Sequence, residues 1–110
     1  MAEEFVKIVV FVPTDFAVSV RQAIGDADAG KIGNYTHCSF STKGTGRFKP
    51  QQGAHPTIGE IGKLEEVEEE RIEVICLKNK ANKVIEVIKK VHPYEEVALD
   101  IYPLIGEKDL

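Results

Sequence analysis

The chain has 110 residues, of which 43 % are hydrophobic and 29 % are charged, and its formal net charge is −4. This length and composition fit one globular domain over residues 1–110. The net negative charge argues against the strongly basic surface with which proteins bind nucleic acids and anionic membranes. The longest apolar run, Ile8 to Val12, is far shorter than the roughly 20 residues of a membrane-spanning helix. Met1 is followed by an alanine and two glutamates rather than by a basic and then apolar leader. We therefore predict a cytoplasmic protein with no nucleic-acid and no membrane partner.

The first half of the chain contains three predicted segments of regular structure. Residues 5–12 are almost all apolar and rich in β-branched and aromatic side chains, which predicts a central strand. Apolar residues recur at helical spacing over residues 16–27, and Thr14 or Asp15 can cap this helix because their side-chain oxygens accept from its free N–H groups. Residues 35–43 alternate in polarity and predict a second strand.

A hairpin and a long loop are expected next. Lys-Gly-Thr-Gly at residues 43–46 is typical of a tight turn, and residues 47–49 form its predicted return arm. Residues 50–62 contain three glycines and predict an irregular loop. Loops of this length in small domains often carry function.

The second half of the chain repeats the plan of the first. Residues 64–77 begin acidic and become apolar, which predicts a long strand whose first half lies at an edge, where charge discourages aggregation. Asn79 can cap a second helix over residues 81–91, whose apolar positions fall on one face. Residues 97–102 alternate and predict the last strand.

The predicted order of elements is strand–helix–strand–strand–helix–strand, which duplicates one split βαβ unit. This order is typical of the ferredoxin-like fold. We therefore predict an α+β domain with an antiparallel sheet, two helices on one face and an extra β-hairpin. The uncovered face of such a sheet favours association into a homo-oligomer.

Five sequence blocks resemble the inserted domain of the NGG-one-interacting-factor-three-like family, in the family's order and over nearly the whole chain. The blocks are YTHCSF at residues 35–40, GTGRFKP at 44–50, GAHPTIG at 53–59, EVE at 66–68 and HPYEEVA at 92–98. The resemblance implies a stand-alone domain with a fold similar to the signal-transduction protein PII and the divalent-cation-tolerance protein CutA. Those proteins assemble as trimers of ferredoxin-like subunits, so the resemblance favours a trimer here.

The resemblance also limits the function that can be inferred. Full-length members of the family hold two metals through flanking segments, and these segments have no counterpart in this sequence. The family's hydrolase-like and GTP-cyclohydrolase-homologue labels concern those longer chains. An enzymatic activity is therefore not carried over to this chain.

The block after the second predicted helix concentrates groups that suit a cation. His92, Glu95 and Glu96 are candidate ligands for a divalent metal such as Zn, Mn or Fe, and His37 is a further candidate. The alternative is structural, with His92 at the end of the helix, where a donor stabilises the last carbonyl groups. The spacing does not decide between the two, and the two cysteines lack any metal-type spacing.

Other residues are candidates for contact with a small ligand. His55 lies on the glycine-rich loop, and Arg47 could hold an anionic group. Tyr94 and Phe48 could pack against a ligand or against a neighbouring subunit.

Together these observations favour a non-catalytic module that binds a small ligand or a metal and self-associates. One alternative is a metal-assisted hydrolase in which His92 and Glu95 or Glu96 activate water. A second alternative is a structural partner for a separate metal-bearing chain.

Overall fold

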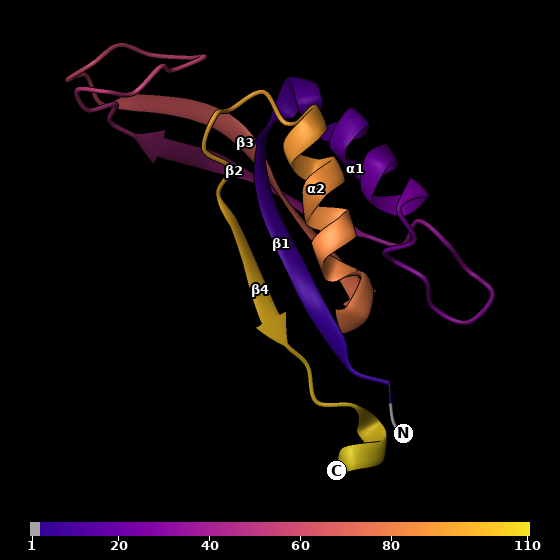
Figure 1. The fold of residues 1–110 in the computed structure, drawn as a ribbon. Coiled ribbons are helices and arrows are strands. Elements are labelled where there is room, and N and C mark those ends of the chain that lie inside the picture. Colours follow the sequence, from indigo (N-terminus) through magenta and orange to yellow (C-terminus); the bar gives the residue numbers. More distant parts are fainter. Residues whose placement is uncertain (1–2) are drawn as a thin grey trace.

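The computed structural model describes residues 3–110 and shows a four-stranded antiparallel sheet with two helices on one face (Figure 1). In chain order the elements are β1 (Phe5–Pro13), α1 (Ala17–Asp26), β2 (Phe40–Phe48), β3 (Glu65–Leu77), α2 (Ala81–Val91) and β4 (Leu99–Pro103). Short 3-10 helices cover Thr14–Phe16, Lys78–Lys80 and Glu107–Asp109. The strands lie in the order β2-β3-β1-β4, and all three neighbouring pairs are antiparallel. The predicted ferredoxin-like arrangement is confirmed.

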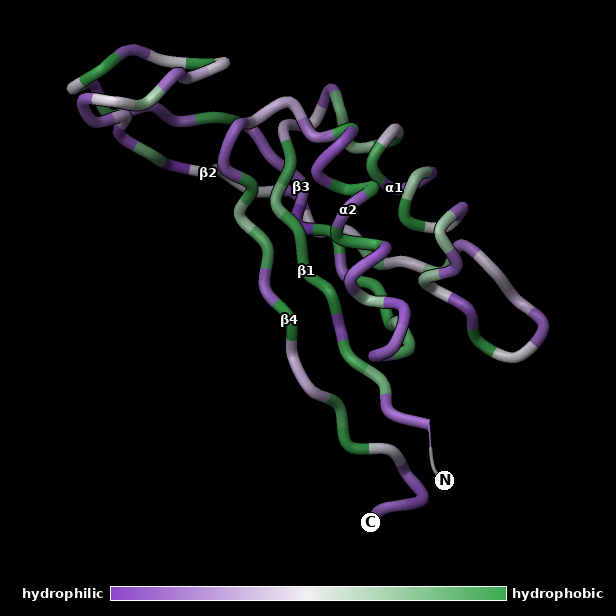
Figure 2. Tube along the Cα trace, viewed as in Figure 1, coloured by the Kyte–Doolittle hydropathy of each residue, from purple (hydrophilic) through white to green (hydrophobic). Residues whose placement is uncertain are grey.

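The hydrophobic core lies between the helices and the two central strands. Alternate residues of β1 and β3 point to the helices, and each helix contributes one apolar stripe. Figure 2 shows the hydrophobic residues concentrated along β1 and within α2. Burying one Val or Ile side chain contributes about 1.5–3 kcal/mol, so this layer supplies most of the stabilisation. The core residues include Val6, Ile8, Val10, Val12, Ala17, Val20, Ile24, Ile72, Val74, Cys76, Ala81, Val84 and Ile88.

Strands β2 and β3 form a two-stranded arm that projects beyond the helices (Figure 1). The pairing is continuous from Phe40 opposite Glu73 to Phe48 opposite Glu65. The molecule therefore measures 49 × 23 × 22 Å, with a radius of gyration of 15.4 Å. A spherical domain of this length would have a radius of gyration of about 13 Å. The loop over residues 49–64 lies at the tip of this arm.

The predicted hairpin at residues 43–46 is wrong. Gly44 and Gly46 lie inside the continuous strand β2, and the chain reverses in the 49–64 loop instead. The glycine at position 46 has a packing role, because the carboxylate of Glu69 occupies the space where a Cβ on residue 46 would stand. The strand predicted over residues 35–43 begins only at Phe40, since the left-handed backbone of His37 (φ 59°) interrupts the extended conformation.

The predicted helix caps are also wrong. No side-chain cap from Thr14, Asp15 or Asn79 is present, since the N-cap positions are Phe16 and Lys80 and neither makes a side-chain cap hydrogen bond. Each helix instead follows directly from a 3-10 turn. The turn satisfies the first backbone N–H groups locally, so a polar cap is not needed.

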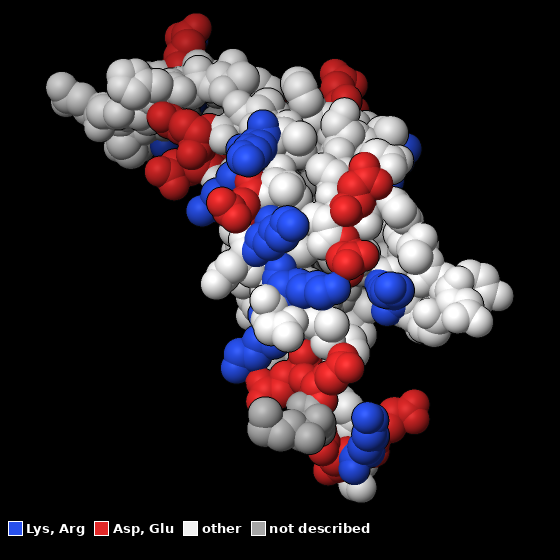
Figure 3. All heavy atoms as spheres, turned by 45° about the vertical axis from the view of Figure 1, so that its right-hand side comes forward, with Lys and Arg blue, Asp and Glu red and all other residues white. Residues whose placement is uncertain are grey.

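Charged side chains cover the sheet face opposite the helices. Lys7 and Arg71 both pair with Glu73, at 3.8 and 3.6 Å, and the Arg71 guanidinium lies 5.7 Å from the ring centroid of Phe11. Val9, on the same face, is fully buried beneath them. Figure 3 shows that acidic side chains flank basic ones on the helical side, so that side carries charges of both signs. Within residues 3–110, no helix is both long enough and apolar enough to span a membrane.

Candidate functional site

A cavity of about 370 Å³ lies between two irregular segments, alongside the β2–β3 arm. One segment is the 49–64 loop, and the other is the connection between α2 and β4, which runs from the end of α2 toward the arm (Figure 1). Three aromatic rings line it, from Phe11 on β1, Phe48 on β2 and Tyr94 on the connection. This volume lies within the range of small-molecule sites in proteins, about 300–1,000 Å³.

His92 anchors the α2–β4 connection beneath this cavity. Its Nε2 donates to the carbonyl oxygen of Phe11 at 2.8 Å, and its Nδ1 accepts from the backbone N–H of Tyr94 at 3.1 Å. Burial lowers the pKa of His92, which favours the neutral ring that these two bonds require. Both ring nitrogens are occupied, so His92 ties the end of α2 to the central strand. This arrangement supports the structural interpretation of His92.

The structure does not bring the four predicted metal ligands together. His37 lies against α1, where its Nε2 is 3.0 Å from Oδ1 of Asp26, and Glu95 accepts from the backbone N–H of His55 at 2.8 Å. Over the described residues 3–110, no group of three or more His, Cys, Asp or Glu side chains could hold a metal ion. The predicted set of His92, Glu95, Glu96 and His37 therefore does not form one metal site within this chain.

Three of the four predicted ligand contacts do lie together at the cavity. Arg47, Phe48 and Tyr94 line it, and the rings of Phe48 and Tyr94 meet edge to face at 5.7 Å between centroids. Arg47 is largely exposed and lies 3.6 Å from Glu66. The side chain of His55 is exposed and does not line the cavity, although its backbone N–H helps to hold the loop.

The 49–64 loop is attached to the α2–β4 connection by two hydrogen bonds. The Thr57 hydroxyl donates to the carbonyl oxygen of Pro93 at 2.8 Å, and the N–H of His55 donates to Glu95. These bonds hold one wall of the cavity against the other. The apolar residues of the loop, Pro50, Ala54, Pro56 and Ile58, face the enclosed space.

Sequence analysis missed the most unusual residue of the site, Glu69. It is only 9 % exposed, and it lines the cavity from β3. Among residues 3–110 no hydrogen bond or ion pair to its carboxylate is found, and burial alone raises its pKa. The signal was present in the alternation of β3, which places Glu69 on the sheet face opposite the helices, across from Gly44.

The phenol of Tyr94 is the second polar group without a partner. Its hydroxyl oxygen is buried and makes no hydrogen bond within the part of the chain that the structure describes. Burial raises the pKa of Tyr94, and the nearby charge of Glu69 raises it further. Buried polar atoms are nearly always hydrogen-bonded, so an unpaired Tyr94 hydroxyl in a cavity that Glu69 also lines indicates a place for a ligand.

Comparison with known proteins identifies relatives that are much longer than this chain. No protein-family model matches it. The chain is 52 % identical over 105 residues to a GTP cyclohydrolase 1 type 2 homolog of Halalkalibacterium halodurans, matching 96 % of this chain and 28 % of that protein. It is 52 % identical over 98 residues to the Bacillus subtilis protein of the same name, matching 89 % of this chain and 26 % of that protein.

Solved structures that superpose on this chain include a NIF3-related protein and a protein of a different family with the same fold. A Bacillus cereus protein related to NIF3 superposes with a TM-score of 0.85 at 54 % identity, covering 96 % of this chain and 27 % of that chain. The periplasmic divalent cation tolerance protein CutA of Archaeoglobus fulgidus superposes with a TM-score of 0.69 at 18 % identity, covering 96 % of this chain and 89 % of that chain. The second likeness shows the fold alone. The chain is therefore similar over nearly its whole length to one part of the NIF3-related proteins, as its sequence blocks predicted; it has a CutA-like fold and spans about a quarter of the length of these relatives.

Proposed function

We propose that this chain is a non-catalytic module that binds a small molecule in the cavity between the 49–64 loop and the α2–β4 connection. One observation carries the proposal. The cavity has apolar walls and contains the buried Tyr94 hydroxyl, which has no hydrogen-bond partner among residues 3–110, and the Glu69 carboxylate, which has no ion pair there and faces the open space. Polar groups of this kind are costly to bury alone, and a ligand with complementary groups would offset the cost.

The geometry supports a binding role better than the alternative role as a hydrolase. A general base must be free to accept a proton from water. His92 already uses both ring nitrogens for backbone hydrogen bonds, and Glu95 is engaged by the N–H of His55. Glu96 lines the cavity, whereas the exposed His55 does not.

We also propose that the module self-associates in the cytoplasm, with a trimer favoured by the resemblance to PII and CutA. Both outer strands of the sheet, β2 and β4, have one edge without a neighbouring strand in the described chain. Unpaired strand edges are natural sites for association. An alternative role is that of a structural partner for a separate metal-bearing chain, because the relatives are several times longer than this chain.

A single experiment tests the binding role. ¹⁵N-labelled protein is titrated with a fragment library while amide shifts are followed at Phe48, Tyr94 and Glu69. The matched variants are Ala98→Trp, which fills the cavity from its lining, and Ser19→Trp, which adds the same side chain on exposed α1. We expect binders whose shifts map to the cavity, with binding lost in Ala98→Trp and retained in Ser19→Trp. Binding that survives Ala98→Trp, or a library without any cavity binder, would reject the proposal.

Native mass spectrometry with elemental analysis of the same untagged sample tests the assembly. A mass of three chains without a stoichiometric metal is the expected result. A monomer at micromolar concentration would contradict self-association. A stoichiometric metal would show that ligands from more than one chain combine, because the described residues of one chain do not supply a set.

A further inference from the structure

The Glu69 carboxylate lines the cavity and lacks, among the described residues, the ion pair that its neighbour Glu70 makes. Glu69 and Glu70 are both buried on β3, at 9 % and 8 % exposed. Glu70 points to the helical side and is neutralised by Arg21, whose Nη1 lies 2.6 Å from its Oε1. Glu69 points to the opposite side and has no such partner in residues 3–110. The fold therefore balances one of two adjacent buried charges and leaves the other facing an open space.

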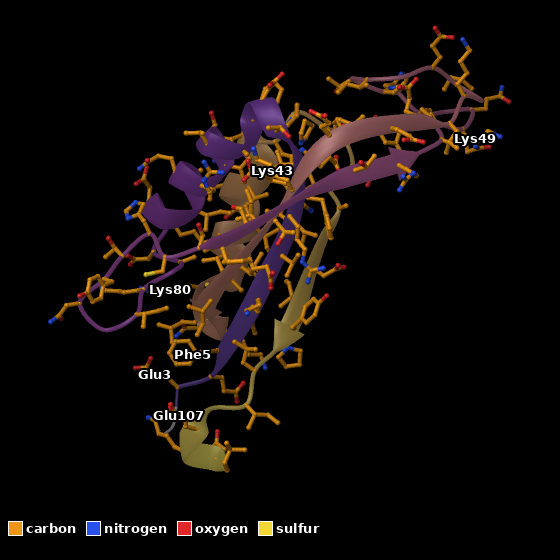
Figure 4. The ribbon with its side chains drawn as sticks, turned by 180° about the vertical axis from the view of Figure 1, so that it is seen from behind. Glu3, Phe5, Lys43, Lys49, Lys80 and Glu107 are labelled. Atoms are coloured by element: carbon orange, nitrogen blue, oxygen red, sulfur yellow. The ribbon has the colours of Figure 1, made fainter. Side chains whose placement is uncertain are left out.

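Lys43, Arg47 and Arg71 line a second hollow together with Glu69, but their ion pairs within residues 3–110 are not with its carboxylate. Arg71 lies two residues along the same face, but its guanidinium contacts Glu73 and the Phe11 ring. Arg47 contacts Glu66, and Lys43 lies opposite Glu70 in the strand register. Lys49 also lines the cavity, from the far end of the β2–β3 arm, well beyond Lys43 (Figure 4), and it is exposed.

We propose that the ligand of this cavity carries a positively charged nitrogen group that hydrogen-bonds to the Glu69 carboxylate, on a flat apolar body that packs against Phe48 and Tyr94. This inference rests on the proposed binding function. A charged N–H donor is the partner that an isolated buried carboxylate accepts best, because the charge-assisted bond is short and strong. The unpaired Tyr94 hydroxyl lies in the cavity that Glu69 also lines, so it can bond to a second polar atom of the same ligand.

The rest of the lining agrees with a flat cationic ligand. Phe48 and Tyr94 meet edge to face, and this arrangement presents a ring face on which a planar group can stack. Aromatic faces also attract cations. Two acidic residues, Glu95 and Glu96, and two basic residues, Arg47 and Lys49, also line the cavity and are all exposed, whereas Glu69 is buried. The buried charge is thus acidic, while the basic groups stay in solvent.

The space for the Glu69 side chain depends on a glycine of the facing strand. The Glu69 carboxylate lies over Gly46, where a Cβ would collide with it. Any other residue at position 46 would displace the carboxylate from its place in the cavity wall. This close approach explains why β2, which would be more stable with β-branched residues, carries a glycine at this point.

Three probes of the same shape and different charge test the inference. Benzamidine is cationic, benzamide is neutral and benzoate is anionic, and each is titrated into the ¹⁵N-labelled full chain up to millimolar concentration. We expect benzamidine to shift the amides of Phe48 and Tyr94 and to bind at least about tenfold more tightly than the other two probes. The variant Glu69→Gln keeps the shape and removes the charge, and it should weaken benzamidine binding about tenfold or more. Glu68→Gln, which neutralises an exposed neighbour on the other face, should leave it unchanged.

Each result has one meaning. Equal cavity binding of benzamide or benzoate would overturn the cationic class while leaving the binding function intact. Benzamidine binding that is unchanged in Glu69→Gln would show that Glu69 is not the recognition group, and it would overturn the inference. Failure of benzamidine to shift any cavity residue would also overturn it, and the fragment library then decides separately whether the cavity binds other ligands.

Discussion

The substitution His92→Ala separates a structural role from a ligand-binding role for the histidine of the HPYEE block. The imidazole is 6 % exposed and makes two hydrogen bonds to backbone groups, one to the carbonyl of Phe11 and one from the N–H of Tyr94. Removing it leaves both backbone groups without a partner, at about 1–1.5 kcal/mol each, and removes the ring packing against Tyr94 at 5.2 Å. We expect a loss of about 3 kcal/mol in the free energy of unfolding.

Urea unfolding followed by circular dichroism measures this loss directly. For a domain of this size, 1 kcal/mol corresponds to about 4–8 °C in melting temperature. A loss of about 3 kcal/mol should therefore lower the melting temperature by more than about 10 °C. The control His55→Ala removes an exposed imidazole and should change stability by less than about 0.5 kcal/mol. A His92→Ala protein that unfolds at the same urea concentration as the parent would refute the structural interpretation.

The pH dependence of the same pair of proteins gives an independent check. Burial lowers the pKa of His92 in the folded state, so the folded protein favours the neutral ring. The stabilising effect of His92 is therefore complete above the unfolded pKa of about 6.5 and declines as the pH falls below it. The difference in stability between the parent and His92→Ala should shrink between pH 7 and pH 5. A difference that grows on acidification would contradict the assigned hydrogen bonds.

Three further substitutions test contacts in the cavity, on the helical side of the sheet and along α1. Glu69→Gln should raise the melting temperature at pH 7, because burial raises the pKa of Glu69 and makes its ionised form costly. The gain should vanish below about pH 4, where the carboxyl is protonated in both the folded and the unfolded protein. A lower melting temperature at pH 7 would contradict this account. Arg21→Ala leaves the buried carboxylate of Glu70 unpaired and should lower the free energy of unfolding in urea by about 1–3 kcal/mol. This range is reduced because Arg21 is one-third exposed. A change near zero would show that solvent already screens the pair. Gly25→Ala should destabilise the chain despite the better helix propensity of alanine, because the new Cβ would collide with the imidazole of His37. The double variant with His37→Ala should recover the lost stability. Equal stability of the single and double variants would argue against the contact.

The local periodicity of the sequence determined the order and type of the main elements. The apolar run of β1 and the helical stripes of α1 and α2 predicted a buried strand and two amphipathic helices, and all three are present. These predictions succeed because the period of hydrophobic residues records which face of an element is buried. The hairpin predicted at residues 43–46 is wrong, since glycine occurs both in turns and where a neighbouring side chain comes close to the backbone. The Glu69 carboxylate makes such a close approach at Gly46, whereas the space beside Gly44 is open.

Some residues of the candidate site were predictable from the sequence, whereas the roles of others depend on the tertiary structure. The sequence singled out Arg47, Phe48 and Tyr94, and the structure places all three on one cavity. It could not indicate that both nitrogens of His92 are used, because their partners are the backbone of Phe11 and Tyr94, and the first lies 81 residues away. Nor could it separate Glu69 from the acidic run around it. Residue type and spacing are local properties, whereas the partner of a buried charge depends on strand register and sheet face, which only the tertiary structure decides.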